Sequence, residues 1–223
     1  MQRTGVIPIQ QFRDLFVSWP DNESLTLKDL RMKCITLLAL TAMLRPSDVA
    51  PQAQLFDPET FSVDRLAFSF RQVTFTPDGN LQIVFHGIKN DTDRKGFPVT
   101  ISAGSCKKLD PVSCLLSYTN RTKIMRQAIT DEPVFLSLTR PYRAIGSTTI
   151  ASVLGYAIAA AGLGGQGYSA KSFRPTGATA AVNTGCDPKT AMQIGRWKTD
   201  SVFYTHYVHS TPAQDYTDRL LAS

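Results

Sequence analysis

Four side chains near the C-terminal end of the sequence carry groups that suit reaction at a phosphodiester. Lys171 and Arg174 stand three residues apart, Trp197 follows a glycine and an arginine, and Tyr207 comes ten residues after the tryptophan. The cations would bind phosphate oxygens, the indole would donate its N–H and exclude water, and the phenol would be a nucleophile. Residues 169–207 therefore predict a site for phosphoryl transfer.

Two cations elsewhere in the chain extend this set. Arg45 follows a long apolar segment and precedes Pro46, which is an unusual place for a charged side chain. A guanidinium donates two parallel hydrogen bonds, so Arg45 and Arg174 would together hold both non-bridging oxygens of one phosphate. Lys89 lies in a basic loop, where it would protonate a leaving alkoxide, and Lys95 in the same loop is the alternative.

Each of these residues also has a purely structural interpretation. A Lys-x-x-Arg pair is more often a solvated helix face, a tryptophan more often anchors a core, and tyrosines mostly pack or cap. A basic loop is often only a solubilising turn. The order of the whole series along the chain favours the chemical interpretation.

The elements that must position these residues are mainly helical. Alternating apolar and polar residues predict strands near 66–75, 81–87 and 97–101, with a turn at 77–80. We expect an α+β, mainly helical fold with a small antiparallel sheet near residues 66–101, in one domain over residues 1–223. Apolar spacing and capping signals place the helices at 8–19, 24–44, 110–128, 147–161, 172–185, 188–195 and 199–209.

Composition narrows the class of protein. Hydrophobic residues make up 43% and charged residues 19% of the chain, as in soluble globular proteins. The net charge of +6 favours a polyanionic partner, although a solvated basic face gives the same value. Four scattered cysteines argue against a zinc site and a disulfide framework. Without a membrane-spanning run or a signal-peptide layout, we expect a soluble, intracellular protein.

The series of motifs resembles the catalytic domain of the tyrosine recombinases, also called the phage integrase family. The resemblance covers nearly all of residues 25–210, and the stretch GRWKTDSVFYTHYVH is similar to transposon-encoded eukaryotic members of the Crypton and DIRS-like groups. The matching segments are LRPSD at 44–48, GIK at 87–89, KSFR at 171–174, GRW at 195–197, and Tyr207. They resemble the family's first arginine box, hairpin lysine, His-x-x-Arg box, His/Trp box and nucleophile.

The resemblance implies a site-specific recombinase or transposon integrase that cuts and rejoins DNA through a 3′-phosphotyrosyl intermediate. In such an enzyme Tyr207 would attack the phosphodiester. Arg45 and Arg174 would stabilise the pentacoordinate phosphorane, and Lys171 and Trp197 would assist them.

The resemblance also implies the remaining roles and the partners. Lys89 would be the general acid, and Asp48 would support the arginine site. We expect no ATP, because the phosphotyrosyl bond conserves the bond energy, and no metal, because the arginines would do the work that a metal does in other enzymes. The expected partner is double-stranded DNA, on which a homotetramer forms by exchange of residues 210–223, with a monomer in its absence. A eukaryotic source would place the protein in the nucleus.

Three features depart from the family. Lys171 stands where the family has histidine, and Tyr204 competes with Tyr207 because the two share one face of the predicted helix. The family's N-terminal DNA-clamping domain is missing from the sequence. A second hypothesis therefore stays open, a catalytically inactive DNA-binding or interaction module derived from a recombinase. The topoisomerase IB family shares the chemistry, but it fits the chain length and turn motifs less well.

Overall fold

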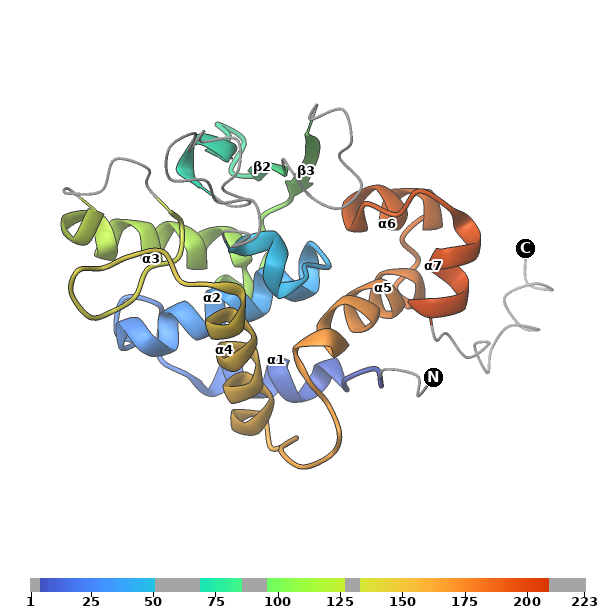
Figure 1. Ribbon diagram of the computed structural model, residues 1–223, viewed down its shortest axis with the longest axis horizontal. Helices are drawn as coiled ribbons and strands as arrows, with labels where there is room; N and C mark the ends of the chain where they lie inside the picture. The colour runs from blue at the N-terminus through green and yellow to red at the C-terminus, as the bar shows by residue number, and fades with distance from the viewer. Residues whose placement is uncertain (1–4, 51–68, 86–95, 127–132, 209–223) are drawn as a thin grey trace.

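The fold is built from helices that pack around the apolar helix α2, with a small sheet on one side (Figure 1). The computed structural model describes residues 5–50, 69–85, 96–126 and 133–208. The α-helices are α1 Ile9–Ser18, α2 Leu27–Thr41, α3 Pro111–Arg126, α4 Ser147–Ala160, α5 Phe173–Asn183, α6 Pro188–Gly195 and α7 Asp200–His206. The short 3-10 helices are η1 Pro46–Val49, η4 Phe70–Gln72, η5 Lys107–Leu109 and η6 Ala170–Ser172. The strands are β1 Val73–Phe75, β2 Leu81–Phe85 and β3 Phe97–Ile101. The predicted α+β, mainly helical fold is confirmed.

Helix α2 forms the centre of the hydrophobic core. It begins at a cap in which the Thr26 hydroxyl accepts a hydrogen bond from the backbone N–H of Asp29 at 3.1 Å. Every side chain from residue 33 to residue 40 is buried, because α3, α4 and α5 all pack against this helix. The prediction that α2 continues to residue 44 is wrong. The helix ends at Thr41, and Met43 turns the chain with a positive φ of 50°.

The sheet is antiparallel in the order β1-β2-β3. Alternate residues of β2 face the core, and they are Leu81, Ile83 and Phe85. The predicted turn at 77–80 is confirmed, with Gly79 at a φ of 82°. The prediction of a strand over all of residues 66–75 is wrong, because Phe70–Gln72 forms η4, in which the Gln72 side chain accepts a hydrogen bond from a backbone N–H.

Several cations hold loops of the fold in place. Lys33 is fully buried and donates to the side-chain oxygen of Asn22 at 2.8 Å, and its burial lowers its pKa. Lys108 and Arg121 donate to backbone carbonyls around the same loop, between α1 and α2. Arg126 donates to two carbonyls of the segment after α3. Part of the net positive charge therefore stabilises the fold and does not face a ligand.

The last three helices form a layer that packs on α2 through α5 (Figure 1). Helix α6 begins at Asp187, whose carboxylate accepts from the backbone N–H of Thr190 at 3.0 Å. A second, smaller core joins this layer to the end of α2, and it consists of Met43, Ala178, Ala191, Met192, Trp197 and Phe203. Across the described ranges, no helix combines the length and apolar character needed to cross a membrane.

Helix α5 packs so closely on α2 that an added methyl group would separate them. A Cβ at Gly177 would lie 2.3 Å from the carbonyl oxygen of Leu40 and 3.1 Å from the side chain of Met43. We expect Gly177→Ala to lower the free energy of unfolding by about 2 kcal/mol, although alanine favours helix by about 1 kcal/mol. The control Gly155→Ala in α4 has nothing within 4 Å of the new Cβ, so it should be neutral or stabilising. Urea unfolding followed by circular dichroism compares the two, and equal effects would contradict this packing.

Candidate functional site

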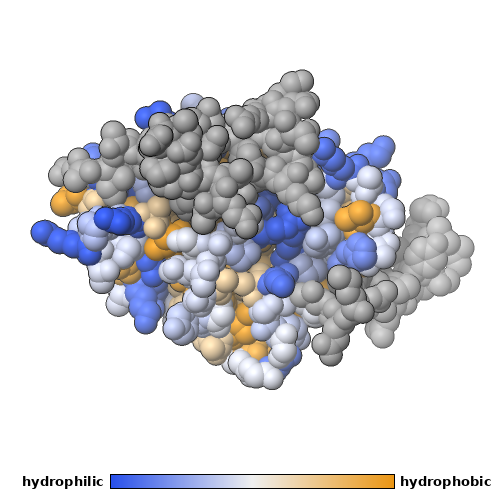
Figure 2. Space-filling view, in the orientation of Figure 1, coloured by the Kyte–Doolittle hydropathy of each residue, from blue (hydrophilic) through white to orange (hydrophobic). Residues whose placement is uncertain are grey.

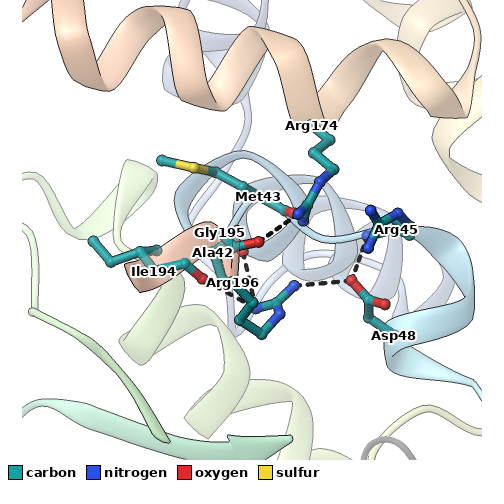
Figure 3. A network of polar contacts seen from close by, with 8 residues as sticks. All are labelled: Ala42, Met43, Arg45, Asp48, Arg174, Ile194, Gly195 and Arg196. Carbon is teal, nitrogen blue, oxygen red and sulfur yellow. Dashed lines mark hydrogen bonds and ion pairs between the residues drawn. The ribbon is translucent and has the colours of Figure 1, made fainter. Parts of the chain in front are cut away.

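The candidate site lies where the C-terminal ends of α2 and α6 meet the first turn of α5. Figure 3 shows Arg45, Arg174, Arg196 and Asp48 gathered there, joined by hydrogen bonds to one another or to backbone carbonyls. On the face shown in Figure 2, strongly hydrophilic residues collect between η1 and α5. The site therefore combines a polar surface with charged groups that reach into the fold.

Arg174 is held by the ends of two helices. Only 3% of it is exposed, and its guanidinium donates to the carbonyl oxygens of Met43 and Gly195. Carbonyls at a helix C-terminus lack intrahelical partners and carry partial negative charge, so both ends stabilise the cation. The guanidinium lies 4.0 Å from the ring centroid of Trp197 and 5.3 Å from that of Tyr207. Its Nε has no hydrogen-bond partner among the described residues.

Arg196 forms a second bridge between the same two helix ends. Its guanidinium donates to the carbonyls of Ile194 at 3.1 Å and Ala42 at 3.4 Å, and to the carboxylate of Asp48 at 2.9 Å. The ring of Phe85 in β2 lies 4.3 Å from the guanidinium carbon. Arg196 belongs to the Gly-Arg-Trp segment at 195–197, in which the sequence predicts a role for Trp197 alone. The available signal was a charged residue between apolar neighbours at the end of a predicted helix.

Asp48 connects Arg196 to Arg45. The same carboxylate oxygen, Oδ2, accepts from the backbone N–H of Arg45 at 2.9 Å and from the Arg196 guanidinium. In this described network Asp48 pairs with the guanidinium of Arg196 and the backbone of Arg45, and the Arg45 side chain is half-buried. Burial, and then the charges of Arg45 and Arg196, lower the pKa of Arg174 to about 9, while Asp48 opposes the shift. A guanidinium still stays protonated at neutral pH, so the cluster favours an anionic ligand.

The structure separates the two candidate tyrosines. Tyr207 follows the end of α7, and its half-buried ring lies 4.8 Å from that of Trp197 and beneath the guanidinium of Arg174. Tyr204 lies within α7, is 48% exposed and packs its ring on Phe203. Helix α7 lies within the predicted range of 199–209 but ends at His206, so Tyr207 follows the helix that was expected to carry both tyrosines on one face. Of the two tyrosines, Tyr207 is the one whose ring contacts the guanidinium of Arg174.

Trp197 anchors the site in the smaller core. Its ring packs between those of Phe203, at 5.0 Å, and Tyr207. A Cβ at Gly195 would lie 1.7 Å from the indole, so glycine is required there by the close approach of the ring. The left-handed residue at the end of α6 is the next one, Arg196, with a φ of 61°. The indole Nε1 is buried without a hydrogen-bond partner among the described residues.

The structure does not group all the predicted site residues. Lys171 lies exposed in η6, whereas Arg174 is buried in α5, so the two cations of the Lys-x-x-Arg pair lie in different environments. The hairpin lysines Lys89 and Lys95, and the predicted exchange segment 210–223, lie outside the described residues. The site that is described consists of Arg45, Asp48, Arg174, Arg196, Trp197 and Tyr207.

Solved DNA recombinases and integrases have a similar fold. XerA recombinase matches with a TM-score of 0.63 and 15% identity over 98% of this chain and 65% of that chain. XerH site-specific recombinase bound to its difH substrate matches with a TM-score of 0.62 and 12% identity, over 95% of this chain and 51% of that chain. The Tn1549 transposon integrase in complex with transposon right end DNA matches with a TM-score of 0.58 and 10% identity, over 100% of this chain and 66% of that chain.

These likenesses establish the fold, and the fold predicted from the family resemblance is confirmed. The chain spans between half and two thirds of the length of these three solved structures. The sequence itself matches no protein-family model and no curated protein. The Crypton and DIRS-like subgroup stays a prediction.

The contact between Gly195 and the indole leads to a spectroscopic prediction. In a Trp19→Phe background Trp197 is the remaining tryptophan. Adding Gly195→Ala should displace the ring, shift its fluorescence emission to longer wavelength and cost about 2 kcal/mol of stability, as overpacking does. Gly146→Ala, where nothing lies within 4 Å of the new Cβ, is the control and should leave the emission unchanged. Unshifted emission in Gly195→Ala would contradict the described position of the ring.

Proposed function

We propose that the chain is the catalytic part of a DNA strand-transfer enzyme, a site-specific recombinase or transposon integrase. The observation that carries this proposal is the position of Arg174, buried between two helix ends with its guanidinium over the rings of Trp197 and Tyr207. A phosphate bound beside Arg174 would lie next to a phenol, which is a nucleophile. The shared fold with recombinases and integrases supports the same conclusion.

In the proposed reaction the Tyr207 oxygen attacks phosphorus, and the bond from phosphorus to the 5′ oxygen of the next nucleotide breaks. The phenol loses its proton, the 5′ oxygen gains one and leaves as a hydroxyl, and the DNA 3′ end becomes a phosphotyrosyl ester. A 5′-hydroxyl of another strand then attacks this ester, releases the tyrosine and rejoins the DNA. One phosphoester bond forms and one breaks in each step, so the exchange is close to balanced in energy.

The arginine cluster would supply positive charge where the transition state gains negative charge. Arg45 and Arg174 would contact the non-bridging oxygens, and Trp197 would offer its unpartnered indole N–H. Lys171 is exposed near the start of α5, where it would contact the DNA backbone. Lys89 remains the proposed general acid that protonates the 5′ oxygen.

The proposed partner is double-stranded DNA. The XerH and Tn1549 structures were solved with DNA bound. By analogy with the family, the chain would assemble on DNA as a homotetramer through exchange of residues 210–223 and would be a monomer without DNA. A nuclear location follows for a eukaryotic source.

The choice of nucleophile is tested with a nicked suicide DNA substrate on a denaturing gel. We expect wild type and Tyr204→Phe to form a covalent protein–DNA band, and Tyr207→Phe to form none, since its ring lacks the attacking oxygen. The two variants remove the same atom from neighbouring tyrosines, so each controls for the other. Loss of the band only in Tyr204→Phe would overturn the site assignment. Salt-sensitive DNA binding without any band, also in a protein that carries an upstream DNA-clamping domain, would favour the inactive binding module.

The role of Arg174 is tested by a change that keeps its charge. Arg174→Lys should lower the cleavage rate about 100-fold, because an ammonium cannot hold both carbonyls and a phosphate in a fixed plane. Arg126→Lys is the matched control, because Arg126 is also buried and also donates to two backbone carbonyls. Single-turnover cleavage at saturating DNA measures both variants. Equal rates in the two would refute a role for Arg174 in the reaction.

A further inference from the structure

We propose that Arg196 is a positioning residue, whose ion pair with Asp48 keeps this carboxylate from neutralising Arg45 and Arg174, so that both retain their charge for the phosphate. This inference rests on the proposed function, which identifies the ligand as a phosphodiester. It assigns a role to a residue that the family resemblance leaves without one.

The contacts of Arg196 with the described residues are directed into the protein. Its side chain is 1% exposed, and the two terminal nitrogens donate to the carbonyls of Ala42 and Ile194 and to Asp48. The ring of Phe85 covers the guanidinium carbon. These contacts suit a residue that acts on its neighbours, and the ion pair with Asp48 is the contact that sets Arg196 apart from Arg174.

Asp48 is the neighbour on which Arg196 acts. The Asp48 side chain is 4% exposed, and its Oδ2 accepts both the Arg196 guanidinium and the backbone N–H of Arg45. The electrostatic effect of Asp48 already reaches Arg174, where it raises the pKa against the effect of burial. If Arg196 were neutral, a buried carboxylate would lose its paired charge, which is strongly unfavourable. It would then pair with Arg45 or Arg174, the other cations of the cluster.

The backbone at Arg196 is consistent with selection for this side chain. The residue adopts a φ of 61° and a ψ of 42° at the end of α6, a left-handed conformation that glycine or asparagine adopts at lower cost. The chain has its glycine one position earlier, where the Trp197 ring requires it. Strained residues of this kind cluster at functional sites, because the surrounding contacts hold them in place.

The test compares Arg196→Met, Asp48→Asn and the double variant, using inorganic phosphate as the ligand. The increase in melting temperature with phosphate, against chloride of matched ionic strength, gives an apparent Kd. We expect Arg196→Met to bind phosphate at least tenfold more weakly than wild type, which corresponds to about 1.4 kcal/mol. Asp48→Asn should bind at least as well as wild type. The double variant should recover most of the phosphate affinity lost in Arg196→Met, because without the Asp48 carboxylate no negative charge remains to neutralise Arg45 and Arg174.

Arg126→Met is the matched control, since it removes another buried, carbonyl-bound arginine. It should lower the melting temperature without changing the response to phosphate, which separates anion binding from stability. If Arg196→Met does not fold, the double variant decides, because only the proposed role predicts that it folds and responds. An unchanged response in Arg196→Met, a double variant as weak as the single, or no response in wild type would each overturn the proposal.

The suicide-substrate assay on the same proteins separates this inference from the proposed function. A covalent band in wild type without the expected phosphate pattern overturns the role of Arg196 and leaves the strand-transfer reaction standing. The expected phosphate pattern without any covalent product supports the role of Arg196 at an anion site and refutes the reaction.

Discussion

The described site depends on two helix C-termini that point at two buried guanidinium groups. Carbonyls of residues 42 and 43, beyond α2, and of residues 194 and 195, in α6, accept from Arg174 and Arg196. Each arginine thus links two elements that lie far apart in the sequence, and the unpaired carbonyls of each helix end obtain donors. Any change that moves one helix end would disturb both cations together, so the fold and the charge of the site cannot vary independently.

Charge is distributed unevenly between the fold and the site. Lys33, Lys108, Arg121 and Arg126 donate to loops that join the helices of the core, so their charge supports the fold. The site instead places several guanidiniums near one carboxylate in the interior of the protein. Removing these charges from water is unfavourable unless other groups stabilise them. Helix dipoles, aromatic faces and Asp48 offset part of that cost. A bound phosphate would offset more of the cost of burying these cations. The position of the cations therefore says more about a ligand than the net charge of +6 does.

Trp197 shows that structural and chemical interpretations of one residue need not exclude each other. Its ring fills the smaller core against Phe203 and requires glycine at position 195. The same ring supports the guanidinium of Arg174 and lies against Tyr207. Packing of the indole therefore places the cation and the phenol relative to each other, and substitution of Trp197 would affect stability and chemistry together.

The sequence alone determined what short-range interactions control, and the tertiary structure decided what depends on distant contacts. The cap at Asp187 and apolar periodicity predicted helices because these signals act within a few residues. The order of motifs identified five members of the described site, Arg45, Asp48, Arg174, Trp197 and Tyr207. The partner of Arg196 lies 148 residues away, so no local pattern could reveal it. The early end of α2 and the different environments of Tyr204 and Tyr207 likewise follow from packing between helices, which alone decides which carbonyls, rings and charges meet.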